Sequence, residues 1–135
     1  MKLAPYITYQ GNCQEAIDFY KAVFDAEIVE IHHYGSSEMK VKEKDKNKIL
    51  HVELKIGNNT LMASDASEEH PVSNGNNVTM ALMYDNPDVG EQIFNALSNG
   101  GNVLLPFQDT FWGARFGMLV DKFGINWSVN CDIKK

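Results

Sequence analysis

The chain has 135 residues, a length that fits one domain and suffices to bury a core without disulfides or a structural metal. Hydrophobic residues make up 44% and charged residues 22% of the sequence, which excludes the composition of a disordered chain. The formal net charge of -6 disfavours nucleic acid as a partner, because that binding depends on basic side chains. Since no long apolar run occurs, we expect a cytoplasmic protein with no membrane partner.

The two cysteines, Cys13 and Cys131, lie far apart and outside any zinc-binding spacing. Such usage fits reduced thiols in a reducing compartment. Cys13 falls on an apolar helix face, which favours a packing role over a nucleophilic one.

The first half of the chain predicts a strand, a helix and three further strands. Residues 3–9 favour a strand, and Asn12 with Glu15 has the spacing of a capping box, so a helix should begin there. The helix carries an apolar stripe at helical spacing, formed by Cys13, Ile17, Tyr20 and Phe24. Further strands are expected at 27–34, 48–56 and 60–64.

The second half predicts the same order again. A strand is expected at 78–84, followed by a helix that Asn86 caps and Pro87 begins. The apolar stripe of this helix is expected to consist of Val89, Ile93 and Leu97, and further strands are expected at 102–107, 114–120 and 125–131.

This duplication predicts the fold class. The halves match at an offset of about 75 residues, which is typical of two copies of one supersecondary unit. We therefore expect an α+β fold with two βαβββ modules in a pseudo-twofold arrangement. The single domain 1–135 would consist of module 1–66, a polar linker 67–76 and module 77–131.

Three sequence motifs allow a comparison with a known family. They are Pro-Tyr-Ile-Thr-Tyr-x-Gly-Asn-Cys-x-Glu-Ala-Ile-x-Phe-Tyr-x-x-Val-Phe at 5–24, Leu-Met-Ala-Ser-Asp at 61–65, and Phe-Trp-Gly-Ala-Arg-Phe-Gly-Met-Leu-Val-Asp-Lys-Phe-Gly-Ile-Asn-Trp at 111–127. These motifs closely resemble the PhnB-like branch of the vicinal oxygen chelate superfamily, which includes glyoxalase and bleomycin-resistance proteins. The resemblance implies two βαβββ modules around a cleft and a homodimer. It leaves function open, because the superfamily contains metal-dependent enzymes and metal-free drug-sequestering proteins.

The resemblance also implies where a metal would be held. In the glyoxalase I branch, His, Gln or Glu side chains of the first and last strand of each module bind a divalent ion. The corresponding positions here are Pro5, Met62, Thr79 and Ser128. Proline and methionine offer no hard donor, and hydroxyl groups bind divalent ions weakly without carboxylates. We therefore expect no metal at these positions and no cofactor.

An alternative metal site remains open on another strand. His51 and Glu53 share one strand face by alternation, and either His32 or His33 would be the third ligand. A lone His-x-Glu on a strand is more often a surface pair. This site would make the chain a metal-dependent lyase, isomerase or dioxygenase.

Without a metal, the cleft is expected to have an apolar lining with a few polar points, which suits a drug-sized organic molecule. Trp112 is a candidate for stacking on a ligand, and Arg115 is a candidate for holding an anionic group. The alternative is that Trp112 packs between subunits and Arg115 pairs with an acid. Trp127 alternates with cleft positions and should lie in the core. The expected lining residues are Pro5, Ile7, Tyr9, Met62, Ser64, Thr79, Ala81, Met83, Asn126 and Ser128.

The sequence therefore predicts a metal-free small-molecule binding protein of the glyoxalase/bleomycin-resistance type. A nucleophile elbow, a phosphate loop and a dinucleotide fingerprint are all absent from the sequence, so no catalytic residue is assigned. Relatives of this branch often carry the name of ubiquinone-pathway methyltransferases, but no pocket for S-adenosylmethionine can be located in the sequence. A pure dimerisation module is the third possibility, if side chains fill the cleft.

Overall fold

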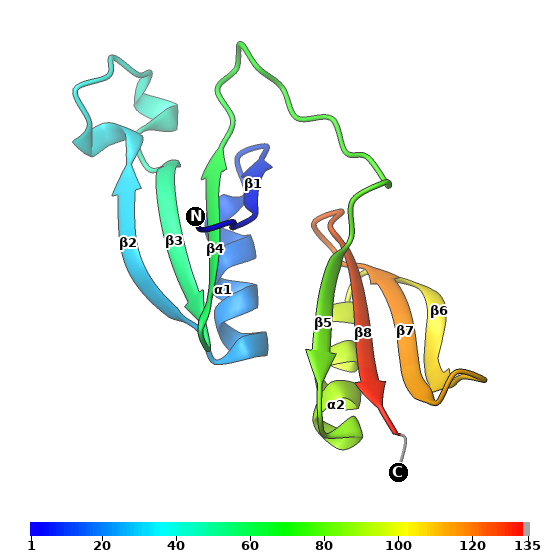
Figure 1. The fold of residues 1–135 in the computed structure, drawn as a ribbon. Coiled ribbons are helices and arrows are strands. Elements are labelled where there is room, and N and C mark those ends of the chain that lie inside the picture. Colours follow the sequence, from blue (N-terminus) through cyan, green and yellow to red (C-terminus); the bar gives the residue numbers. More distant parts are fainter. Residues whose placement is uncertain (134–135) are drawn as a thin grey trace. The chain divides into compact units, whose positions relative to one another are not determined.

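The structure, a computed structural model, describes residues 1–133 and confirms the predicted α+β fold of two βαβββ modules (Figure 1). Two compact units divide between Ser73 and Asn74, and we call them unit 1 and unit 2 in chain order. Both α-helices contain 12 residues, and within residues 1–133 no helix is long and apolar enough to cross a membrane.

Unit 1 is a four-stranded sheet with one helix packed against it. Strand β1 runs parallel to β4, the other pairs are antiparallel, and the strand order is β1-β4-β3-β2. Two short 3₁₀ helices, η1 (Tyr34–Ser36) and η2 (Glu43–Asp45), lie between β2 and β3. The main elements are β1 (Tyr6–Tyr9), α1 (Cys13–Phe24), β2 (Glu27–His33), β3 (Ile49–Ile56) and β4 (Asn59–Asp65).

The core of unit 1 forms where α1 meets the sheet. The predicted stripe is buried at Cys13, Ile17 and Tyr20, and each fully buried large apolar side chain contributes about 1.5–3 kcal/mol to stability. Burial, followed by the charge of Asp65, raises the pKa of the Cys13 thiol to about 12, so the thiol stays protonated at neutral pH.

The expected capping box at the start of α1 does not form, because a buried carboxylate takes its place. The Asn12 side chain makes no capping hydrogen bond. The backbone N–H of Cys13 instead donates to Asp65 Oδ1 at 2.9 Å. A residue of β4, distant in sequence, therefore satisfies the helix start.

Unit 2 repeats the arrangement. Its strand order is β5-β8-β7-β6, with β5 parallel to β8. The predicted cap of α2 is confirmed, since Asn86 Oδ1 accepts the N–H groups of Asp88 and Val89. The elements are β5 (Met80–Tyr84), α2 (Pro87–Ser98), β6 (Asn102–Asp109), β7 (Ala114–Val120) and β8 (Asn126–Asp132).

The buried face of α2 is rotated from the predicted stripe. Gly90, Phe94 and Leu97 are buried, whereas Val89 is 39% exposed. The reason is a close approach of the helix to β8, because a Cβ atom at Gly90 would collide with the Sγ atom of Cys131. Glycine is a weak helix former, but at position 90 its missing side chain lets α2 pack closely against β8.

Candidate functional site

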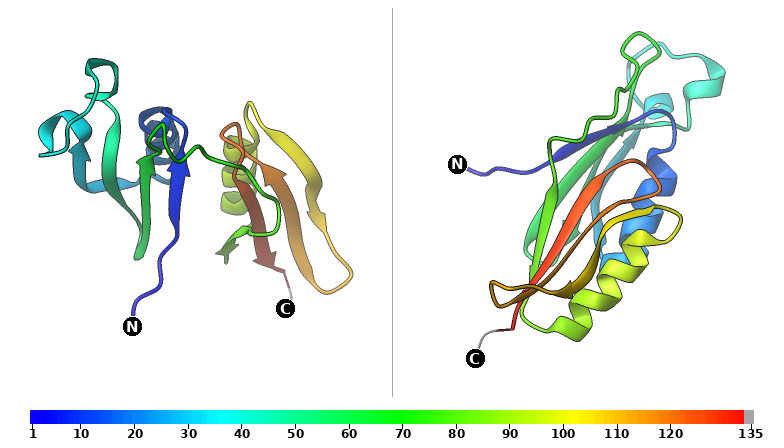
Figure 2. Two further views of the ribbon diagram at one scale, coloured as in Figure 1. Left: turned by 90° about the horizontal axis from the view of Figure 1, so that it is seen from above. Right: turned by 90° about the vertical axis from the view of Figure 1, so that its right-hand side faces the viewer.

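In each unit the helix packs against one face of the sheet and leaves the other face open (Figure 2). Strand alternation and register assign the side chains to these open faces. Open face 1 carries Tyr6, Thr8, Glu30, His32, His51, Glu53, Lys55, Met62 and Ser64. Open face 2 carries Ala81, Met83, Leu105, Phe116, Met118, Asn126, Ser128 and Asn130.

The structure places Ile7 and Tyr9 on the face that α1 covers, which corrects the expectation that they share a face with Met62. Tyr9 is 3% exposed, and its hydroxyl donates to that of Tyr20 on α1 at 3.3 Å. Tyr6, which precedes Ile7 in β1 and therefore points to the opposite face, pairs with Met62 and lies on open face 1. The core under α1 requires apolar side chains, and this requirement sets the phase of β1.

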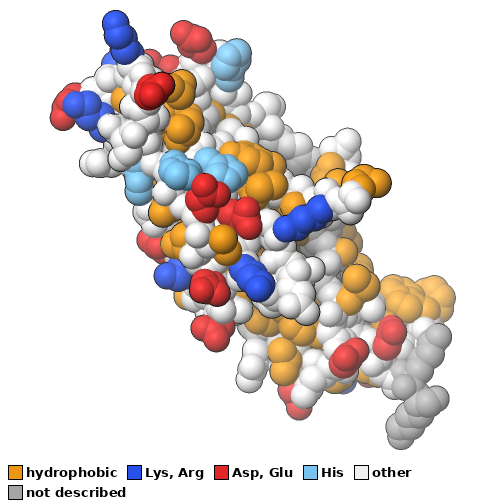
Figure 3. Space-filling model, turned by 60° about the vertical axis from the view of Figure 1, so that its left-hand side comes forward, with side chains coloured by type: hydrophobic (Ala, Val, Ile, Leu, Met, Phe, Trp, Pro, Cys, Tyr) orange, Lys and Arg blue, Asp and Glu red, His pale blue; other side chains and the backbone are white. Residues whose placement is uncertain are grey.

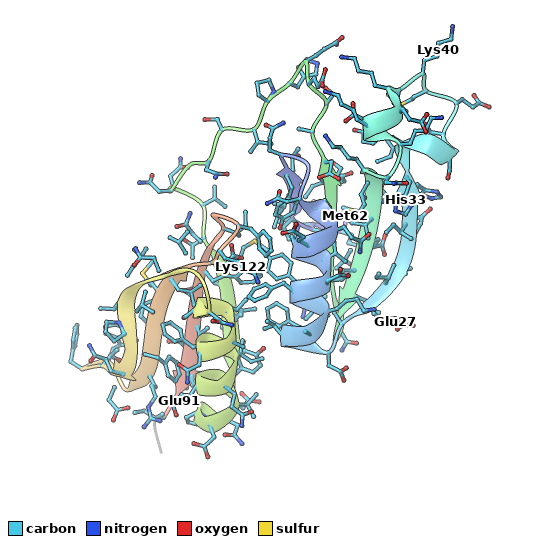
Figure 4. The ribbon with its side chains drawn as sticks, turned by 180° about the vertical axis from the view of Figure 1, so that it is seen from behind. Glu27, His33, Lys40, Met62, Glu91 and Lys122 are labelled. Carbon is cyan, nitrogen blue, oxygen red and sulfur yellow. The ribbon has the colours of Figure 1, made fainter. Side chains whose placement is uncertain are left out.

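The four strand positions implied for a metal offer only weak donors. Pro5 precedes β1, and its carbonyl oxygen accepts the N–H of Met62 at 3.1 Å. Met62 is half-buried on β4, in the middle of unit 1 (Figure 4). Thr79 is exposed just before β5, whereas Ser128 is 7% exposed in β8.

Within unit 2 the structure brings several predicted lining residues together. Ala81 and Ser128 are register partners, and Met83 pairs with Asn130 on the same face. Met83 is 80% exposed on this face. Another predicted lining residue, Asn126, lies on this face, and its side-chain amide donates to the Gly75 carbonyl.

Arg115 lies on the opposite face from Ser128, so it cannot anchor a ligand on open face 2. It is the register partner of the buried Cys131. Its Nε donates to Asp109 Oδ1 at 2.8 Å, and this hydrogen bond raises the pKa of the guanidinium. The acid-paired alternative for Arg115 is therefore the one that the structure supports.

Trp112 lies in the β6–β7 hairpin and is 47% exposed. Its indole makes edge contacts with Phe111 and with Phe116 of open face 2, at ring-centroid distances of 5.1 and 5.9 Å. Trp127 is 2% exposed, so its predicted place in the core is confirmed. Trp112 is thus the tryptophan that a ligand on open face 2 would reach.

His51 and Glu53 do come together with a third ionisable side chain, but that side chain is Glu30. The potential ligating atoms of these three residues lie within 4.8 Å of one another. His32 donates from Nε2 to Glu30 Oε1 at 2.7 Å, and this bond lowers the pKa of Glu30. His33 lies at the end of β2 (Figure 4) and is absent from this cluster.

Glu53 also lines a shallow hollow of about 620 Å³ at one end of unit 1. The hollow is wide open and its lining is largely polar, which is unlike an enclosed apolar ligand pocket. Its lining residues are Lys2, Glu27, Ile28, Val29, Glu53, Lys55, Asn58 and Thr60.

Sequence reasoning missed three residues that matter here: Glu30, Phe116 and Met118. Glu30 has the same alternation phase as His32, but its position opposite Glu53 depends on the register irregularity between Ile28 and Glu30. Phe116 and Met118 alternate along β7 with the buried residues Gly117 and Leu119. This pattern indicates that the second face of the strand is also apolar.

Comparison with known proteins agrees with this architecture. The sequence pattern of the 3-demethylubiquinone-9 3-methyltransferase family matches residues 1–130. The crystal structure of protein PA1353 from Pseudomonas aeruginosa is 36% identical, with a TM-score of 0.90 and 98% of each chain covered. A PhnB protein from Bacillus cereus is 23% identical, with a TM-score of 0.83 and coverage of 97% of this chain and 99% of that chain.

A more distant structure shares the fold alone. It is the fosfomycin resistance protein FosX from Listeria monocytogenes, complexed with Mn(II) and 1S,2S-dihydroxypropylphosphonic acid. Identity is 9% and the TM-score is 0.67, with 98% of this chain and 92% of that chain covered. Given the two βαβββ modules and a match over residues 1–130, the chain belongs to the 3-demethylubiquinone-9 3-methyltransferase family, in the PhnB-like branch of the vicinal oxygen chelate superfamily.

Proposed function

We propose that the chain binds a small organic molecule on open face 2 and that the contact is made by side chains without a metal. The supporting observation is the composition of this face. Phe116 and Met118 are only half-buried there, and Met83 is exposed. Aromatic rings supply flat contact area, and methionine adapts to ligand shape.

A planar, largely apolar ligand fits this face best. Phe116 and Trp112 already make an edge contact, so a flat molecule would find ring surfaces at one end of the face. Asn126, Ser128 and Asn130 offer polar groups along β8 that would fix its orientation. Pro5, Met62, Thr79 and Ser128 lack the donors for a firmly held ion, which supports binding by shape.

Methyl transfer, the activity in the family's name, is not part of this proposal. That reaction requires a methyl donor held against the acceptor in a pocket that excludes water. The hollow beside Glu53 is open and largely polar. Binding of an organic molecule is the function for which the described side chains provide a surface.

A ligand screen tests this proposal. Planar aromatic compounds of drug size are screened by thermal shift in the presence of EDTA, and at least one is expected to raise the melting temperature. Phe116→Ala should lower the affinity for that compound by about tenfold, because one aromatic contact contributes about 1.5 kcal/mol.

The matched control is Met39→Ala, which removes an exposed apolar side chain from unit 1. It should leave the affinity unchanged. A screen without any binder in EDTA, or a binder that is indifferent to Phe116→Ala, would contradict the proposal.

We also propose that the chain is a homodimer. The support comes from two exposed aromatic side chains in the β6–β7 hairpin: Phe111 is 98% exposed, and Trp112, whose ring centroid lies 5.1 Å from that of Phe111, is 47% exposed. Large exposed apolar side chains close together are typical of subunit interfaces. Light scattering should give about twice the 15.2 kDa chain mass, and Phe111→Asp should shift the protein toward the monomer. A wild-type protein that stays monomeric at high concentration would refute the dimer.

A further inference from the structure

Open face 1 contains a group of ionisable side chains that the proposed ligand contact does not use. Glu30 projects from β2, and His51 and Glu53 project from the neighbouring β3. One ligating atom from each lies within 4.8 Å of the others. Figure 3 shows histidine and acidic side chains side by side on one face of the molecule.

Glu30 and Glu53 are direct register partners across the two strands. Two like charges in such a position destabilise the strand pair. His51 and Glu53 are half-buried, which reduces screening by water. A bound cation would turn this repulsion into attraction, so the arrangement favours a positively charged ligand.

Two neighbouring side chains hold the cluster in place. The Tyr6 hydroxyl is hydrogen-bonded to His51 Nδ1 at 2.9 Å, and the two rings stack at a centroid distance of 5.6 Å. His32 is bonded to Glu30 Oε1 at 2.7 Å. Outer hydrogen bonds of this kind orient the side chains that ligate metals.

The repeat shows that the cluster is not a requirement of the fold. Glu53 pairs with Met62 in unit 1, and Met118 pairs with Ser128 at the equivalent place in unit 2. By the same registers His51 corresponds to Phe116, and Glu30 corresponds to Leu105. The same sheet position is thus ionisable in one unit and apolar in the other, so a stable sheet does not need these charges.

We propose that Glu30, His51 and Glu53 bind one first-row divalent transition-metal cation on unit 1. Two carboxylates and one imidazole are a ligand set that such ions accept, and three protein ligands leave coordination positions for water or an added ligand. The Tyr6 hydroxyl engages Nδ1, so Nε2 is assigned as the ligating nitrogen. Bonds of about 2.0–2.2 Å require the ligating atoms to approach to roughly 3–3.5 Å, which side-chain rotation provides.

Mn²⁺ binding to the full chain tests this site. The untagged protein is treated with EDTA, dialysed and titrated with Mn²⁺, and the free ion is followed by electron paramagnetic resonance. Mn²⁺ is the appropriate probe because it prefers oxygen and nitrogen ligands to the thiolates of Cys13 and Cys131. One ion should bind per chain.

Glu53→Gln is the main variant because it keeps the side-chain shape and removes the charge. It should lower the affinity for Mn²⁺ by more than about tenfold, and His51→Ala should do the same. Tyr6→Phe, which removes the hydrogen bond to His51, should lower the affinity for Mn²⁺ by about 10-fold. Glu69→Gln and His70→Ala remove exposed loop side chains of the same types and should leave binding unchanged.

Melting temperatures measured in EDTA show whether each variant is folded. If His51→Ala does not fold, the Glu53→Gln variant decides the test. No stoichiometric Mn²⁺ binding by the wild type, or equal binding by a folded Glu53→Gln variant, would overturn the site. The organic-ligand screen is run in EDTA, so failure of the cation site leaves that result standing, and the reverse also holds.

Discussion

Asp121→Ala is expected to destabilise unit 2 by about 3–5 kcal/mol. The Asp121 carboxylate is 3% exposed. It accepts hydrogen bonds from the backbone N–H groups of Phe123 and Ile125 at 2.8 and 3.1 Å, and from Trp127 Nε1 at 2.8 Å. Alanine would remove the acceptor of two donors in the turn between β7 and β8 and of a third in β8, and each such loss costs about 1–3 kcal/mol.

The measurement is urea unfolding followed by tryptophan fluorescence, since Trp127 reports directly on this core. Asp121→Asn is the informative comparison, because its amide oxygen can still serve both backbone donors and only the indole loses its acceptor. The asparagine variant should therefore lose about 1–3 kcal/mol. Equal losses in the two variants would show that the backbone bonds of the turn contribute little.

Asp65→Ala is expected to destabilise unit 1 by about 2–4 kcal/mol. Asp65 is 2% exposed, and its two carboxylate oxygens accept the N–H groups of Cys13 at 2.9 Å and Ile49 at 2.8 Å. One buried carboxylate thus joins the start of α1, the start of β3 and the end of β4. Alanine would leave two buried donors without this acceptor.

Hydrogen exchange measured residue by residue checks this prediction, because unit 1 has no tryptophan. Amide protection in α1 and β3 should fall together in Asp65→Ala. Asp18→Ala is the control, because Asp18 is exposed on α1 and its carboxylate accepts only from Gln14 among the hydrogen bonds described. Protection that falls in β3 alone would contradict the role of Asp65 at the helix start.

Most of the fold could be predicted from the sequence, because the signals that define it are local. The stripe of Cys13, Ile17 and Tyr20 fixed the extent of α1, and the Asn86-Pro87 pair fixed the start of α2. The segment Ala114–Val120 was predicted with the observed bounds. Duplication then led to the two-module architecture, since each βαβββ unit appears twice in the sequence.

The open faces were harder to predict, because they depend on register between distant strands. In β1 the apolar side chains Ile7 and Tyr9 were expected to line the ligand surface, but the core under α1 takes them. The cap of α1 was assigned to Asn12, while the actual acceptor, Asp65, lies more than fifty residues away. Neither contact leaves a signal in the local pattern.

The candidate site shows the same limit. His51 and Glu53 were identified by alternation within one strand, whereas their third partner, Glu30, became visible only through the pairing of β2 with β3. For Arg115 the sequence left two alternatives open, a ligand or an acidic partner, and its phase in β7 directs it to Asp109. Pairing between strands is therefore the information that a single sequence lacked.

The central claim is that an organic ligand binds to the apolar open face of unit 2 without help from a metal. Methyl NMR of protein labelled at its six methionines tests it most directly, recorded in EDTA with the best compound from the screen. We predict that the resonances of Met83 and Met118 shift on ligand addition, while that of Met39 in unit 1 stays in place. If neither Met83 nor Met118 shifts on ligand addition in EDTA, or if only the Met39 resonance shifts, the claim is contradicted.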